Sequence, residues 1–231
     1  MHVQKPLIPY LEKLISNHSV VSISGASGTG KTSLALYLIG NLVEDPSCCV
    51  WIQASESFPK ARMTSMLGDA KEQIEYVLQN TYIIPKRPFE SYSDQVTFFL
   101  PFVSGDTIFP PDLQFIIIDN ISHHLRYELS TTTDITEKVR LLDTFYESII
   151  SPLILKCQRE KVILILIHEV TFDVNTQRTR PFFYKLYDRI KSLQIILNKS
   201  LFSKERTMDI NTGKKTVSFD FTMQEDGFYL I

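Results

Sequence analysis

The sequence is poor in the features that mark specialised classes of protein. Its three cysteines, Cys48, Cys49 and Cys157, are too few for a disulfide framework and lack the spacing of a zinc site, so we expect buried thiols. No apolar run is long enough to span a bilayer, and the first residues lack the apolar stretch and cleavage site of a signal peptide. We therefore expect no membrane contact and a location in the cytoplasm, associated with the nucleoid, or in a nucleus.

The sequence also lacks an overall excess of either charge, because its formal net charge is only −2. The charge is nevertheless uneven. Residues 178–215 contain ten Lys or Arg and three acids, so this segment carries +7 and the remainder −9. Such a block is typical either of a solvated surface or of a surface that attracts a polyanion. With 231 residues and no internal repeat, we expect a single domain over 1–231, opened by a short helical segment at 1–18.

The central motif lies at residues 25–32. These residues read Gly-Ala-Ser-Gly-Thr-Gly-Lys-Thr and match the phosphate-loop pattern GxxxxGK[ST]. Glycines let main-chain N–H groups approach phosphate oxygens, Lys31 would place a positive charge on the β- and γ-phosphates, and the Thr32 hydroxyl would bind Mg²⁺. An apolar run at 19–24 and a helical pattern at 34–42 supply the required strand, loop and helix. The residues expected to bind the nucleotide here are Gly25, Ala26, Ser27, Gly28, Thr29, Gly30, Lys31, Thr32 and Ser33.

A second strong signal is the apolar run at 113–119, which ends in Asp119. A buried parallel strand of this kind delivers a carboxylate to the carboxyl edge of a sheet. In a phosphate-loop protein that carboxylate is the second Mg²⁺ anchor, usually through water. The sequence thus predicts Thr32 and Asp119 as the metal site.

Alternating strand and helix patterns fill most of the remaining chain. Strands are expected at 48–52, 82–84 and 162–167, and helices at 61–79, 91–103 and 134–161, the last with a kink at Pro152. This order predicts an α/β fold with a mostly parallel central sheet covered by helices on both faces. Short strand patterns at 194–198, 206–210 and 216–222, with a turn at 211–213, predict an antiparallel C-terminal extension.

Together these motifs resemble the RecA-like recombinases, and among them the archaeal RadB group of short RadA paralogues. The resemblance rests on the phosphate loop, the strand ending in Asp119, the strand end Ile-His-Glu-Val at 167–170 and the element Thr-Gln-Arg-Thr-Arg-Pro at 176–181. It implies a RecA-type ATPase core that binds ATP and Mg²⁺. It covers nearly the whole chain.

The resemblance also implies a glutamate that polarises the attacking water, within a stretch similar to residues 54–62. Phe58 and Arg62 fall in the register of that stretch, and Arg62 would stack on the adenine. The register places Ser55 at the glutamate position, with Glu56 one residue late. Neighbouring residues of an extended chain point to opposite sides, so either the loop shifts and Glu56 serves, or ATP is hydrolysed poorly.

The strand end at 168–169 departs from the family as well. The family has Asn-Gln there, which senses the γ-phosphate, whereas this chain has His168 and Glu169. Glu169 could accept a hydrogen bond from the attacking water, although its charge opposes the phosphates. The residues expected in catalysis are Lys31, Glu56, Asp119 and Glu169. We assign no metal site to His168 or to the pair at 123–124.

The loop at 171–180 matches the second DNA-binding loop of the recombinases, so the resemblance implies a DNA surface there. Its expected contacts are Arg178, Arg180, Lys185 and Arg189. The family's glycine-rich segment after this loop is replaced by aromatics at 182–184, which suit either base stacking or core packing.

The sequence therefore predicts an ATP-binding RecA-like recombinase paralogue that assists homologous recombination and DNA repair, with weak ATP hydrolysis. Its expected partners are DNA, preferably single-stranded, and a RadA-type recombinase or another recombination protein. The family's polymerisation motif is not found upstream of the phosphate loop, so we expect a monomer or small oligomer rather than a filament. A KaiC-like regulatory ATPase and a scaffold subunit with a structural nucleotide remain alternatives.

Overall fold

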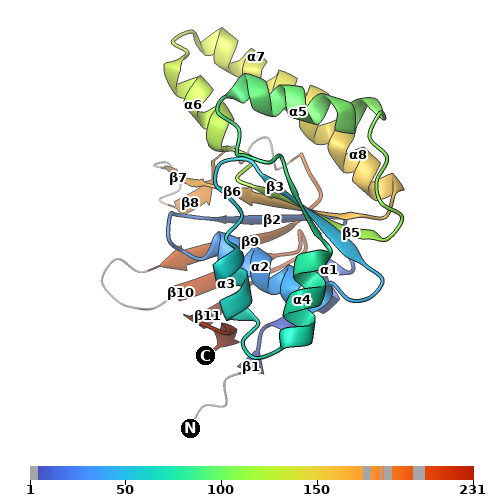
Figure 1. The fold of residues 1–231 in the computed structure, drawn as a ribbon. Helices are drawn as coiled ribbons and strands as arrows, with labels where there is room; N and C mark the ends of the chain where they lie inside the picture. The colour runs from blue at the N-terminus through green and yellow to red at the C-terminus, as the bar shows by residue number, and fades with distance from the viewer. Residues whose placement is uncertain (1–4, 174–177, 183, 185–188, 200–205) are drawn as a thin grey trace.

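The computed structural model describes residues 5–173, 178–182, 184, 189–199 and 206–231, and its centre is one ten-stranded sheet (Figure 1). The strands of this sheet are β1 (Lys5–Pro6), β2 (Val20–Gly25), β3 (Cys48–Gln53), β4 (Thr81–Ile84), β5 (Leu113–Asp119), β6 (Ile163–His168), β9 (Leu193–Lys199), β10 (Arg206–Asn211), β11 (Thr216–Gln224) and β12 (Gly227–Leu230). A separate pair, β7 (Val170–Asp173) and β8 (Arg178–Pro181), forms a small antiparallel sheet. The helices are α1 (Ile8–Ile15), α2 (Lys31–Leu42), α3 (Lys60–Met66), α4 (Lys71–Gln79), α5 (Tyr92–Ser104), α6 (His123–Thr131), α7 (Ile135–Phe145) and α8 (Ser151–Arg159), with a π-helical turn η1 (Tyr146–Ile150) before α8.

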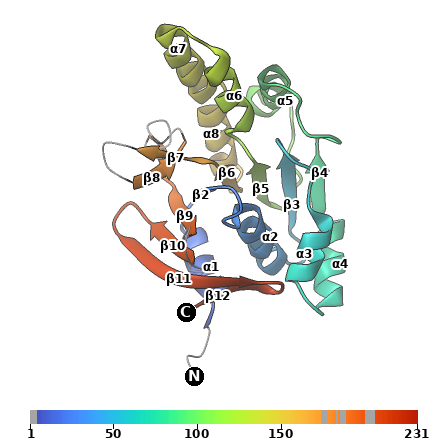
Figure 2. The same cartoon turned by 90° about the vertical axis from the view of Figure 1, so that its left-hand side faces the viewer.

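The sheet has a parallel part and an antiparallel part. Its strand order is β1-β12-β11-β10-β9-β2-β6-β5-β3-β4, and the strands from β9 to β4 run parallel. The strands from β9 to β1 pair antiparallel, and β11 and β12 pass alongside α2 (Figure 2). The predicted fold class, including the antiparallel extension at the C-terminal end, is confirmed.

Alternation along the central strands builds a separate core on each face of the sheet. On β5, Phe115 and Ile117 pack with the side of α1 to α4, whereas Ile116 and Ile118 pack with the side of α5 to α8 (Figure 1). All four side chains are buried, and each contributes roughly 1.5–3 kcal/mol of hydrophobic stabilisation. A strand buried on both faces reads as a continuous apolar run, which is why its sequence signal is strong.

The structure corrects several of the expected elements. The helix predicted over 61–79 is two helices, α3 and α4, because Gly68 adopts a left-handed conformation with φ of +58° between them. The expected kink near Pro152 is the π-helical turn just before it, which accommodates a residue that cannot donate to the preceding turn. The helix α6 and the strands β1, β7, β8 and β12 were not predicted.

Other expectations for the chain hold. The three cysteines are free and buried. The N-terminal helix is present as α1, with Leu11 and Ile15 buried against the core. Within the described part of the chain, no helix combines the length and the apolar character needed to cross a membrane.

Candidate nucleotide site

Three neighbouring parallel strands end at the same edge of the sheet and place the predicted motifs together. In the pairing of β2 with β6, Ser24 lies opposite His168, and in that of β5 with β6, Ile118 lies opposite Leu166. The phosphate loop after β2, the carboxylate of Asp119 on β5 and the residues after β6 therefore meet at the carboxyl edge. Ligand sites of open α/β sheets lie at this edge.

The phosphate loop is a tight turn that depends on glycine. A Cβ atom on Gly25 would lie 2.6 Å from the Leu197 carbonyl oxygen of β9, and Gly30 has a φ of +103°. Helix α2 begins directly after the loop, at Lys31, so the partial positive charge of its N-terminus faces the loop. The Ala26 carbonyl oxygen accepts two hydrogen bonds, one from the Thr29 hydroxyl over 2.8 Å and one from the Lys31 ammonium over 3.1 Å. These contacts hold a cradle with the shape and charge for phosphate.

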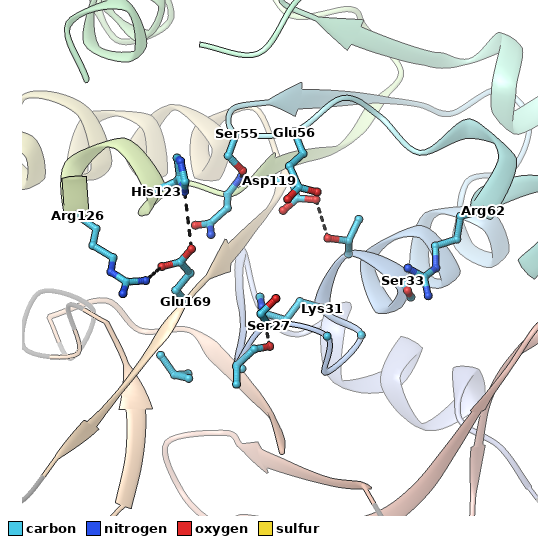
Figure 3. A pocket seen from close by; sticks show the side chains of 17 residues that line it. Ser27, Lys31, Ser33, Ser55, Glu56, Arg62, Asp119, His123, Arg126 and Glu169 are labelled. Carbon is cyan, nitrogen blue, oxygen red and sulfur yellow. Dashed lines mark hydrogen bonds and ion pairs between the residues drawn. The ribbon is translucent and has the colours of Figure 1, made fainter. Parts of the chain in front are cut away.

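The two residues expected to hold Mg²⁺ are in direct contact. The Thr32 hydroxyl donates a hydrogen bond of 2.8 Å to Oδ2 of Asp119, which is buried at the end of β5 (Figure 3). Burial raises the pKa of Asp119 to about 6, an effect that Glu56 increases and that Thr32 and Lys31 oppose. A carboxylate beside a hydroxyl is a suitable oxygen pair for Mg²⁺.

Lys31 lies among three carboxylates. Burial lowers the pKa of its ammonium, and the negative charges of Asp119, Glu169 and Glu56 act in the opposite direction. All four side chains border one cavity of about 460 Å³ (Figure 3). The residues lining this cavity are Gly25, Ala26, Ser27, Gly28, Gly30, Lys31, Thr32, Ser33, Ser55, Glu56, Arg62, Asp119, Asn120, His123, Arg126, Glu169 and Val170.

Ser55 and Glu56 both border the cavity but differ in their contacts. The Ser55 main-chain N–H donates to the Asp119 carbonyl oxygen over 3.1 Å, and its hydroxyl accepts from the Asn120 N–H over 3.2 Å. Ser55 is thus tied to the end of β5. Glu56 is close enough to Asp119 to raise the pKa of that carboxyl. Glu56 thus brings a carboxylate to the cavity although the family register places Ser55 at the glutamate position, and its role in hydrolysis stays a prediction.

Glu169 follows β6 and faces two side chains of α6, Arg126 and His123. Its carboxylate forms an ion pair with the Arg126 guanidinium and lies 3.7 Å from Nδ1 of His123 (Figure 3). His168, one residue earlier, is fully buried, and burial lowers its pKa to about 3. The imidazole of His168 is therefore neutral at physiological pH.

Sequence reasoning missed Asn120 and Arg126 as residues of the cavity. Asn120 directly follows Asp119, so its place at the carboxyl edge was predictable from the strand alone. Arg126 reaches the cavity only because α6 starts at His123 and turns its first residues toward β6. Its signal would have been a helix beginning directly after β5.

Among the described side chains, the predicted DNA-binding residues Arg180 and Arg189 do not line the cavity. Arg178 and Arg180 belong to β8, which pairs with β7, and β7 begins at Val170 on the cavity wall. The Arg180 guanidinium lies 4.6 Å from the ring centre of Tyr184. Arg189 is exposed and lies 3.4 Å from Asp143 of α7. Lys185 lies outside the described residues.

Comparison with known proteins finds similar solved structures and curated sequences, among them the following three. The fold matches the crystal structure of the RadB recombinase with a TM-score of 0.65, over 91% of this chain and 89% of that one, at 18% identity. Half of the chain, 123 residues, is 28% identical to the DNA repair protein RAD57 of Saccharomyces cerevisiae. A stretch of 84 residues, 36% of the chain, is 32% identical to the lipoprotein-releasing system ATP-binding protein LolD 1 of Chlorobium chlorochromatii.

These matches differ in the share of each protein that they cover. The chain spans only 26% of the length of RAD57 and 33% of that of LolD 1, and no model of a known protein family matches it. The structural match extends over nine tenths of the chain. The resemblance to the RecA-like recombinases, and to RadB among them, is thereby confirmed at the level of the fold.

Proposed function

We propose that this protein is a recombinase paralogue that binds ATP with Mg²⁺ and acts as an accessory protein in homologous recombination and DNA repair. Its fold, which is similar to that of the RadB recombinase, supports this proposal. The observation that carries the proposal is the contact between Thr32 of the phosphate loop and Asp119 of β5, at the lip of a cavity bordered by Lys31. This is the arrangement by which phosphate-loop proteins hold a nucleoside triphosphate with its metal.

The phosphate loop, Asp119 and Arg62 each have a defined role in this proposal. The main-chain N–H groups of residues 25–33 bind the phosphates, and Lys31 neutralises their terminal charge. Thr32 and Asp119 would hold Mg²⁺, which would supply positive charge to the phosphate oxygens. Arg62, at the other side of the phosphate loop from Glu169, stacks on the base (Figure 3).

Hydrolysis of ATP is slow in this account. Glu56 is the residue that orients the attacking water, because its carboxylate borders the cavity while the Ser55 hydroxyl is engaged by Asn120. Glu169 is a weak second acceptor, since it is paired with Arg126. Three carboxylates around one lysine oppose the build-up of negative charge on the transferred phosphoryl group.

The DNA surface is proposed on the β7–β8 hairpin and the segment that follows it. Arg178 and Arg180 would contact phosphates of single-stranded DNA, and Lys185 and Arg189 would extend that surface. The hairpin starts at Val170, directly after Glu169, so the nucleotide site and the DNA surface are adjacent in the chain. The similarity to RAD57, a DNA repair protein, supports a role beside a RadA-type or other recombinase.

The proposal is tested by fluorescence anisotropy of labelled single-stranded DNA, titrated with the full chain in a salt series, with and without Mg·ATP. Phosphate release is followed in the same samples. We expect binding that weakens with salt and responds to Mg·ATP, with slow release. If the chain forms oligomers with nucleotide but does not bind DNA, the proposal is contradicted and a KaiC-like regulator is favoured. Loss of stability but not of DNA binding in Lys31→Ala would favour a structural nucleotide.

A further inference from the structure

Arg126, at one end of the cavity, has no role of its own in the function proposed above. The Arg126 guanidinium, from the second turn of α6, is paired with the Glu169 carboxylate beyond the end of β6. The two side chains are 51% and 26% exposed, so both are accessible to a ligand. The His123 imidazole is a second neighbour of Glu169, at 3.7 Å.

This ion pair borders the same cavity as Lys31, and the negative charge of Glu169 acts on the Lys31 ammonium. Lys31 binds the β- and γ-phosphates in phosphate loops. Figure 3 shows Arg62 on one side of the phosphate loop and the pair of Arg126 and Glu169 on the other. A nucleotide whose base stacks on Arg62 therefore extends its last phosphate toward Glu169.

A terminal phosphate and Glu169 are both anionic, and both compete for Arg126. A phosphate carries more charge than a carboxylate and accepts the planar guanidinium fork in two hydrogen bonds. Glu169 retains His123 as a neighbour when the guanidinium leaves. We propose that Arg126 exchanges Glu169 for the γ-phosphate of bound nucleoside triphosphate, and thereby distinguishes ATP from ADP. This inference rests on the proposed function.

The exchange would also change the contacts at the end of the β7–β8 hairpin. The Arg126 guanidinium lies over the Phe182 ring, 5.0 Å from its centre, and the Phe182 N–H donates to the Glu169 carbonyl oxygen over 2.8 Å. Phe182 directly follows β8. Movement of Arg126 toward phosphate removes its contact with the end of the hairpin that carries Arg178 and Arg180. The γ-phosphate is thus sensed at the base of the proposed DNA surface.

The test is calorimetric titration of the full chain with Mg·ATP and, separately, with Mg·ADP. The variants are Arg126→Gln, which keeps a polar side chain without charge, and Glu169→Gln, which removes the competing carboxylate. Arg140→Gln is the matched control, because Arg140 is also an exposed arginine paired with a glutamate, Glu137, but belongs to α7 away from the cavity.

For Arg126→Gln we expect the affinity for ATP to fall about 10-fold or more and the affinity for ADP to change less than about 2-fold. Retained ADP binding also shows that the variant is folded. Glu169→Gln should strengthen ATP binding more than ADP binding, and Arg140→Gln should match the wild type. If Arg126→Gln changes the affinities for ATP and ADP equally, or changes neither, this inference is overturned but the proposed function is not. A wild-type chain that binds neither nucleotide overturns the proposed function, and this inference with it.

Discussion

The bond between Thr32 and Asp119 joins two parts of the chain that are 87 residues apart in sequence. Asp119 is buried, and a buried carboxylate is stable only with a partner that replaces water. Thr32 supplies that partner in the structure, and Mg²⁺ would supply a stronger one. Burial raises the pKa of Asp119 to about 6 because the charged carboxylate has lost water. A bound cation would compensate for that loss.

Glu56 gives the first prediction at the scale of a single residue. If its carboxylate orients the attacking water, Glu56→Gln will slow phosphate release about 100-fold while Mg·ATP still binds. Ser55→Ala is the control, since its hydroxyl only accepts from the Asn120 N–H, and it should keep most of the activity. Phosphate release under saturating Mg·ATP measures both. A larger loss in Ser55→Ala would return the role to the position that the family register indicates.

His168 gives a prediction on pH. Its pKa is about 3 in the fold and about 6.5 in the unfolded chain, so only the unfolded chain takes up the proton as pH falls below 6.5. The stability from the neutral imidazole is complete above pH 6.5 and is lost progressively toward pH 3. The loss is about 2 kcal/mol at pH 5.

The variant His168→Asn keeps a polar side chain that does not titrate. Urea unfolding at pH 7.5 and pH 5 should show a smaller drop in the free energy of unfolding for His168→Asn than for the wild type. Asp119 also shifts its pKa, in the raised direction, but it is present in both proteins and cancels in the comparison. Equal drops in the two proteins would show that His168 does not titrate in this way.

At the scale of elements, strand β10 braces the phosphate loop from outside the motif. The Arg206 guanidinium donates to the carbonyl oxygens of Gly28 and Thr29, over 3.2 and 3.0 Å. These contacts occupy two carbonyl oxygens of a loop whose N–H groups must face the phosphates. The antiparallel extension thus contributes to the nucleotide site, although the sequence of β10 contains no nucleotide-binding motif.

Arg206→Met should weaken Mg·ATP binding about 3- to 10-fold, although Arg206 does not line the cavity, because the loop loses two charge-assisted hydrogen bonds. Lys214→Met, at an exposed position of the turn between β10 and β11, is the matched control. Equilibrium titration with Mg·ATP measures both variants. Unchanged affinity in Arg206→Met would mean that the loop holds its shape without β10.

The elements that the sequence predicted well are those buried on both faces. Strands β5 and β6 are unbroken apolar runs, and only a parallel strand in the middle of a sheet combines that pattern with this length. The phosphate loop was predictable because each of its fixed positions has a steric or electrostatic cause. Asp119 followed from the loop and the strand together.

The elements that the sequence did not predict are short or depend on distant contacts. Helix α6 begins with two histidines and has no capping hydrogen bond from a side chain, so local signals for its start are weak. The break between α3 and α4 rests on Gly68 alone, within an otherwise helical pattern. The hairpin β7–β8 consists of two strands of four residues each, too short for a clear alternating pattern.

At the scale of the whole molecule, the basic segment at 178–215 divides in the structure. Arg206 is engaged with the phosphate loop and Arg189 with Asp143, whereas Arg178 and Arg180 lie on the β7–β8 hairpin. The described part of the segment is therefore not one uniform charged face. In the proposed DNA surface, Arg178 and Arg180 of the hairpin make the first contacts and Arg189 extends them.

Charge reversal tests whether the DNA surface and the nucleotide site are separate. The double variant Arg178→Glu and Arg180→Glu should weaken single-stranded DNA binding about 10-fold or more and reduce its dependence on salt, with the affinity for Mg·ATP unchanged. The matched control is Lys71→Glu with Lys86→Glu, two exposed lysines outside the basic segment. Anisotropy and nucleotide titration on the same preparations measure both properties. A parallel loss of ATP binding would show that the two sites are not separate.

The central claim is that the cavity beside the phosphate loop binds ATP with Mg²⁺. Calorimetric titration of Mg·ATP into the wild-type full chain and into Lys31→Ala tests it most directly. The account predicts saturable binding of one nucleotide per chain, weakened about 10-fold or more in Lys31→Ala, since removal of one charge-assisted phosphate contact costs about 1.4 kcal/mol or more. Absence of binding in the wild type, or binding of equal strength in Lys31→Ala, would contradict it.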